Sequence, residues 1–154
     1  MHENEPVTDG PLGLPDEDGF LAVLEAEEQR ARRHGGMHGL VLIELNLRPG
    51  DGPRVEAAAI ALSASLRETD LLAQIDHRTF GVLALHCDAL EIVVARLRGA
   101  LESVGPELVA SITVRSAGLQ LQTTWSAMVA GDQWRLSPAT RYLPFAVSMP
   151  LSLN

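Results

Sequence analysis

The chain has 154 residues, of which 46% are hydrophobic and 21% charged, the composition of one folded domain of ordinary size. Twenty acidic residues against 12 basic ones give a formal net charge of −8, which argues against a nucleic acid or an anionic membrane as partner. All 12 basic residues are arginines, so any mechanism that needs a lysine is excluded.

Cysteine usage and the acidic start of the chain indicate where the protein works. Cys87 is the single cysteine, so no disulfide can form within the chain, and a reducing cytoplasm fits. Nine acidic residues precede Arg30, the first basic residue, whereas a signal peptide starts with basic residues. No apolar run approaches the ~20 residues of a membrane helix. We therefore expect a soluble, cytoplasmic protein with a flexible acidic leader over residues 1–13 and one domain over residues 14–154.

Apolar periodicity and turn residues predict the elements in chain order. The expected helices span residues 15–34, 53–67 and 88–104, and the expected strands span residues 40–47, 71–75, 80–85 and 108–115. Glycines end the first helix at Gly35-Gly36 and the third at Gly105. Asp88 with Glu91 is typical of a capping box at the start of the third helix.

The order of these elements is a helix followed by β-α-β-β-α-β. It predicts an α+β sandwich with a ferredoxin-like core, in which helices pack on a mixed, mostly antiparallel sheet. The tail from about residue 117 diverges from regular patterns. Trp125, Met128 and Val129 suggest a short helix there, and the apolar run over residues 142–153 suggests an edge strand.

Several short segments occur in an order and at a spacing that are together more specific than any one of them. They are Leu12–Pro15 followed by Phe20-Leu21, then Ala31–Gly36 ahead of a strand, Leu66–Ala73, and Ala110–Val114. Over roughly residues 8–115 the chain resembles the GGDEF family, the diguanylate cyclase domains. The resemblance implies the ferredoxin-like core described above and a role in cyclic di-GMP signalling.

The catalytic residues of that family are replaced here. The resemblance implies two divalent cations held by an acid on the first strand and an acid in a signature hairpin, where they activate one GTP against another. The strand position is Glu44, which retains a carboxylate. The hairpin signature falls on Asp76, His77, Arg78, Thr79 and Phe80. Both signature acids are lost, to Arg78 and Thr79, and a guanidinium repels Mg²⁺.

Other parts of the catalytic machinery are missing as well. Leu47 runs almost directly to Gly50-Asp51, so the segment that reads guanine in the family is deleted, and its phosphate-binding lysines are absent. We therefore expect a degenerate domain that is not an enzyme and holds no metal or cofactor.

A second family feature is retained. The resemblance implies an inhibitory cyclic di-GMP site with the motif Arg-x-x-Asp, which Arg67 and Asp70 match at the family's spacing before the hairpin. Arginine pairs with a guanine edge or a phosphate, and aspartate accepts from guanine N–H groups. Arg96, or Arg98 as a near alternative, matches a further family arginine on the next helix. The competing interpretation is structural: Arg67 near a helix end, with Asp70 capping the turn.

Two functions therefore stay open. One is a non-catalytic cyclic di-GMP receptor that depends on a protein partner for input or output. The other is a nucleotide-independent protein–protein interaction module, with the altered hairpin or the tail over residues 142–153 as its surface.

The remaining candidates have ordinary explanations. His34 and His38 have metal-ligand spacing and His86 adjoins Cys87, but Gly35-Gly36 breaks the helix that would align the first two, so we expect no zinc site. Cys87 is expected as a buried or loop thiol. Trp125, Met128 and Trp134 are expected in packing.

Overall fold

The computed structural model describes residues 13–105 and 108–131. Its helices are α1 (Glu17–His34), α2 (Gly52–Ala64), α3 (Leu90–Val104) and α4 (Leu121–Ala130). Its strands are β1 (His38–Asn46), β2 (Leu71–Asp76), β3 (Thr79–Ala84) and β4 (Val109–Ala117). The elements expected between residues 15 and 115 are confirmed, as is the short helix after residue 117. The expected leader up to residue 12, Trp134 and the run over residues 142–153 lie outside the described residues.

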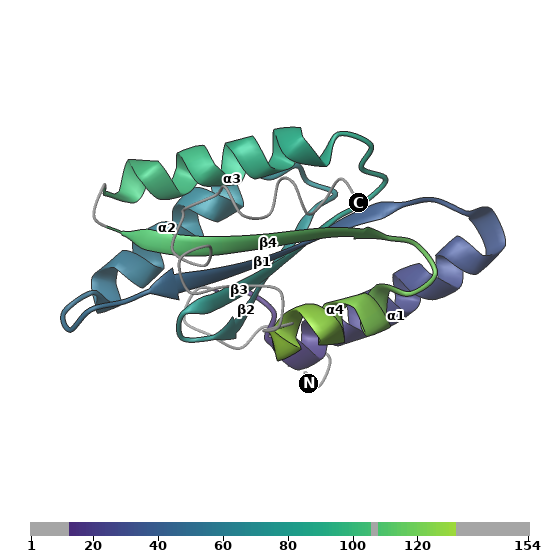
Figure 1. Cartoon of the computed structure of the whole chain (residues 1–154), viewed down its shortest axis with the longest axis horizontal. Coiled ribbons are helices and arrows are strands. Elements are labelled where there is room, and N and C mark those ends of the chain that lie inside the picture. Colours follow the sequence, from purple (N-terminus) through teal and green to yellow (C-terminus); the bar gives the residue numbers. More distant parts are fainter. Residues whose placement is uncertain (1–12, 106–107, 132–154) are drawn as a thin grey trace.

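The four strands form one sheet in the order β2-β3-β1-β4, and each of the three pairings is antiparallel. Helix α2 connects β1 to β2, and α3 connects β3 to β4, so the predicted β-α-β-β-α-β core is confirmed. Figure 1 shows α2 and α3 on one face of the sheet and α1 and α4 on the other. The predicted α+β class is therefore confirmed.

Alternation along β1 divides its apolar residues between the two faces. Val41, Ile43 and Leu45 point to the α2–α3 side, where they pack with Leu62 and Leu97 in one buried cluster. Because both faces of β1 are covered, its run of apolar residues is continuous rather than alternating.

The second cluster lies between the sheet and α1 and α4. Phe20 of α1 meets Trp125 of α4 edge to face, with ring centroids 4.7 Å apart. Gly81 of β3 lies beneath them, and a Cβ built there would be 2.7 Å from the Cη2 atom of Trp125. The absence of a side chain at Gly81 thus allows the indole to approach the sheet.

Three details of the sequence prediction are wrong. The sheet is antiparallel throughout the described residues rather than mixed, because each of its three strand pairings is antiparallel. Helix α3 begins at Leu90 after Ala89, and no side chain caps it, so Asp88 and Glu91 form no capping box. The reason is that the preceding turn is bonded to the start of β1 and fixes where the helix can begin. Helix α2 ends at Ala64 rather than near Arg67, because Ser65 turns the chain and its hydroxyl donates to the Leu62 carbonyl at 2.8 Å.

Among residues 13–105 and 108–131, no helix combines the length and the apolar character needed to cross a membrane.

Candidate functional site

The predicted hairpin joins β2 and β3 through His77 and Arg78. Asp76 organises this turn, because its Oδ1 accepts a hydrogen bond from the Arg78 backbone N–H at 3.0 Å. Burial raises the pKa of Asp76, but this hydrogen bond, another from Thr79, and the charges of His77 and Arg78 together lower it. The first position of the signature is therefore an ionised turn former that holds Arg78 in place.

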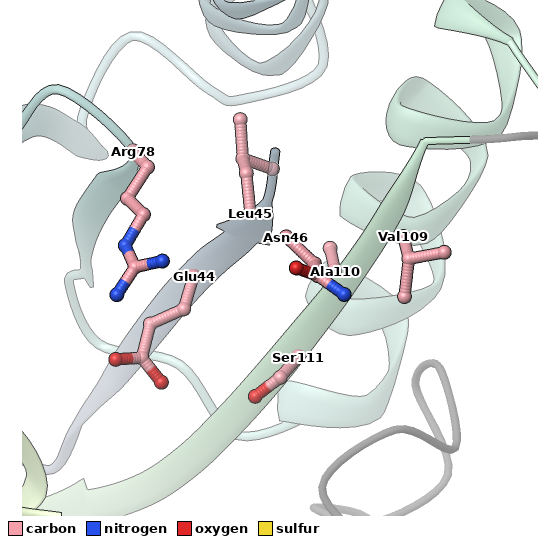
Figure 2. A pocket seen from close by; sticks show the side chains of 7 residues that line it. All are labelled: Glu44, Leu45, Asn46, Arg78, Val109, Ala110 and Ser111. Carbon is pink, nitrogen blue, oxygen red and sulfur yellow. The ribbon is translucent and has the colours of Figure 1, made fainter. Parts of the chain in front are cut away.

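Arg78 and Glu44 border one small cavity at the end of β1 (Figure 2). Strand register creates this site, since Glu44 pairs with Thr79 on one side and with Ser111 on the other. The Arg78 carbonyl also accepts a hydrogen bond from the Leu45 N–H at 2.8 Å, which fixes the hairpin against β1. Figure 2 shows the Arg78 guanidinium and the Glu44 carboxylate on the same side of this cavity.

The chemistry of this cavity differs from that of a two-metal site. Glu44 is the only carboxylate among its lining residues, and a guanidinium accompanies it. No group of three or more His, Cys, Asp or Glu side chains that could hold a metal occurs in the part of the chain that the structure describes. The cavity measures about 150 Å³, below the ~300–1,000 Å³ typical of small-molecule sites.

A second, larger cavity of about 640 Å³ opens at the start of α2, next to the link after β1. Leu47 and Val55 give it an apolar wall, and His77 of the hairpin closes one side. Asp51 is occupied locally, because it accepts a hydrogen bond from the Arg48 N–H at 2.9 Å and lies 3.6 Å from the Nε of Arg54. The size suits a small ligand, but the Asp51 carboxylate already has partners in the Arg48 backbone and the Arg54 side chain.

Arg67 and Asp70 bond to each other in a closed pair, an ion pair with several hydrogen bonds, at the junction of α2 and β2. The Asp70 carboxylate accepts from the Arg67 backbone N–H at 3.0 Å, from Nη2 at 2.7 Å and from Nε at 3.1 Å. The same Nη2 donates to the carbonyl of Leu85 at 2.9 Å, across the end of β3. The hydrogen bond to Asp70 raises the pKa of Arg67. The Asp70 side chain is 1% exposed and that of Arg67 is 41% exposed, so the guanidinium alone faces solvent.

The other two predicted arginines lie on α3, which packs against α2. Arg96 is exposed and Arg98 is partly buried. Sequence spacing singled out Arg67 and Asp70, and their side chains contact each other. It could not indicate the Leu85 carbonyl, since that contact depends on how the turn after β3 folds back.

The sequence matches no protein-family model and no curated protein. Among solved structures, diguanylate cyclase SiaD from Pseudomonas aeruginosa, in complex with its activator SiaC, superimposes with a TM-score of 0.69 at 25% identity, over 82% of this chain and 55% of that one. The GGDEF domain of DgcB from Caulobacter crescentus, in complex with c-di-GMP, has a TM-score of 0.69 at 13% identity, over 88% and 92% of the two chains. A DGC protein from Thermotoga maritima has a TM-score of 0.67 at 17% identity, over 83% and 97%.

The chain has a GGDEF-like fold. The resemblance that residues 12–15, 66–73 and 110–114 predicted is confirmed at the level of the fold. The GGDEF-like domain covers about half of the SiaD chain but nearly all of the DGC protein from Thermotoga maritima.

The structure also shows site residues of the GGDEF-like domain that sequence reasoning missed. Asn46 and Ser111 line the cavity with Glu44, because β4 pairs along the whole of β1. Of the histidines considered for zinc, His34 lies at the end of α1, whereas His38 and His86 meet with ring centroids 4.9 Å apart.

Proposed function

We propose that this GGDEF-like domain is degenerate and acts by binding rather than by turning over GTP. The observation that carries the proposal is Arg78, whose guanidinium borders the Glu44 cavity where the resemblance implies a second metal-binding acid. A fixed positive charge opposes a divalent cation, and the activation of a GTP hydroxyl depends on such cations. The loss of the guanine-reading segment and of every lysine supports the same conclusion.

Incubation with GTP and Mg²⁺ or Mn²⁺, followed by chromatography, tests this proposal. We expect no cyclic di-GMP above the background of a boiled sample. Steady formation over several turnovers would refute the non-catalytic assignment, whatever the ligand-binding results show.

We further propose that the ligand is cyclic di-GMP, bound through Arg67 with Arg96 or Arg98. Arg67 suits this role because its guanidinium is exposed and already oriented by Asp70. A planar, oriented guanidinium pairs bidentately with a phosphate or with the acceptor edge of guanine at little entropic cost. For Asp70 to accept guanine N–H groups, it must release part of its bonding to Arg67.

Calorimetry with cyclic di-GMP at low salt tests this ligand. Arg67→Ala should weaken binding by at least about tenfold, which is a loss of about 1.4 kcal/mol, while the control Arg78→Ala at the hairpin should leave it nearly unchanged. Since Arg67 also bonds Leu85, the thermal midpoint of each variant must be measured in parallel. No heat with the folded wild-type protein and excess ligand would end the receptor proposal.

The second candidate is a nucleotide-independent interaction module, and the closed Arg67–Asp70 pair favours it. The Asp70 carboxylate is buried and its acceptor sites are already used within the chain, as the structural interpretation expects. The similar protein SiaD was solved in complex with a protein activator. Copurification from cells tests this function. A partner protein should remain bound to the wild type and to Arg67→Ala but be lost from the double variant His77→Ala/Arg78→Ala. That result would support an interaction module whose binding surface is the hairpin.

A further inference from the structure

His38 and the turn between β3 and α3 are joined by a hydrogen bond that depends on protonation. His38 is the first residue of β1 and is only 1% exposed. Its Nδ1 accepts from the backbone N–H of His86 at 2.9 Å. A backbone N–H can only donate, so Nδ1 of His38 carries no proton in this arrangement, and the ring is neutral.

The turn is held in an uncommon conformation. His86 has a φ of 48°, in the left-handed region that residues other than glycine rarely adopt. Its ring lies close to Gly36, where an added Cβ would be 3.3 Å from the His86 Nδ1. The next residue, Cys87, donates its backbone N–H to the Met37 carbonyl at 3.2 Å. Two successive N–H groups therefore attach the turn to residues 37–38, and one of the two acceptors is titratable.

The charged groups near His38 have opposite effects on the protonation of its ring. Glu27 of α1 is buried, ion-paired with Arg30 at 3.2 Å, and favours the protonated ring. His86 disfavours it. On β4, Ala117 pairs with His38, and Arg115 lies on the same face beside Leu40. Helix α4 has no ionisable side chain. Burial, followed by the charge of His86, lowers the pKa of His38 despite Glu27.

We propose that protonation of His38 releases the turn over residues 85–88, so that the GGDEF-like domain contains an acid-sensitive latch. On protonation, the Nδ1–H of His38 and the N–H of His86 are two donors facing each other, and their bond is lost. The turn then keeps the bond from Cys87 to Met37, at a backbone position under conformational strain. The same turn provides the Leu85 carbonyl to Arg67, so its release also loosens that contact.

Amide hydrogen exchange followed by NMR tests the latch. Exchange rates of the His86 and Cys87 amides are divided by their intrinsic rates, with the Val41 amide in the centre of β1 as an internal reference. If opening exposes a histidine with the ordinary pKa of 6.5, protection should fall about tenfold per pH unit below 6.5, until the lower pKa of the closed state is reached.

Three variants identify the responsible group. His38→Asn retains an acceptor near Nδ1 without a titration and should abolish the pH dependence. His34→Asn, at an exposed position, and His86→Asn, which retains the backbone donor and tolerates a positive φ, should keep it.

Two results would overturn the latch: protection in the wild type that does not change between pH 7.5 and 4.5, or the same pH dependence in His38→Asn. If His38→Asn fails to fold, the pH dependence of amide protection in the wild type still tests the proposal. The fall in protection must level off at the pH where the His38 ring resonance titrates, and a mismatch between the two rejects the proposal.

Discussion

Both carboxylate oxygens of Glu28 accept hydrogen bonds from Gln122, one from its backbone N–H at 2.9 Å and one from its Nε2 at 3.0 Å. The bonds join the body of α1 to the first turn of α4, where backbone N–H groups have no partner within the helix. A carboxylate at a helix N-terminus also interacts favourably with the helix dipole. Glu28 therefore helps to hold α4 against α1.

Replacing Glu28 should destabilise the protein. We expect Glu28→Ala to lower the free energy of unfolding by about 1–3 kcal/mol, because it leaves a partly buried donor of Gln122 without a partner. Urea unfolding followed by circular dichroism measures this. Glu25→Ala, at an exposed position of the same helix, is the matched control and should change stability by less than about 0.5 kcal/mol. Equal losses in the two variants would show that the contact contributes nothing.

The same contact should depend on pH. Burial raises the pKa of Glu28, but the hydrogen bonds from Gln122 and the charge of Arg32 outweigh it, so the pKa is lowered from 4.5. A lowered pKa in the folded state stabilises the protein above pH 4.5, and this contribution is lost as the pH falls through the folded-state value. The stability difference between the wild type and Glu28→Gln should therefore shrink on acidification. A difference that stays constant from pH 6 to pH 3 would contradict this account.

Local patterns predicted the elements but not the contacts between distant ones. Helix α1 was predictable because its apolar stripe, the Asp16 cap and Gly35 all agree. The pairing of Arg67 with Asp70 was also predictable, since the two are three residues apart. In contrast, Glu28 and Gln122 are separated by 94 positions, and their contact depends on how two helices pack.

The capping error has a related cause. Asp88 has the right residue type and spacing for a cap, but the turn before it is bonded to Met37 and His38 across 48 residues or more. Tertiary contacts therefore override the local preference. The Glu44 cavity likewise needs the register of β1 with β4, which brings in Ser111.

Gly81 gives a test of the packing between the sheet and α4. Gly81→Ala places a methyl group 2.7 Å from Trp125 and should destabilise the protein by about 1–3 kcal/mol. Gly99→Ala, in the exposed part of α3 with open space around it, should instead stabilise by about 0.5–1 kcal/mol. Thermal unfolding of the two variants checks both signs, and a neutral Gly81→Ala would mean that the indole moves freely.

Cys87 should react slowly with thiol reagents. Burial raises the pKa of its thiol, and a hydrogen bond from the Ala89 backbone and the charge of Arg67 only partly offset this. The rate of alkylation of the folded protein by iodoacetamide should still be rising at pH 9. A rate that levels off below pH 8.5 would indicate an activated thiol and contradict this prediction.

The sheet divides the domain into two apolar clusters that share strands but few side chains. Amino-acid replacements on the α1–α4 side and on the α2–α3 side should thus have nearly additive effects on stability. For a lineage of such proteins, this means that one helical layer can diversify while the other is conserved. Leu47 and Val55, on either side of the link after β1, pack against the α2–α3 cluster, so a change in the length of this link needs no compensating change around Trp125.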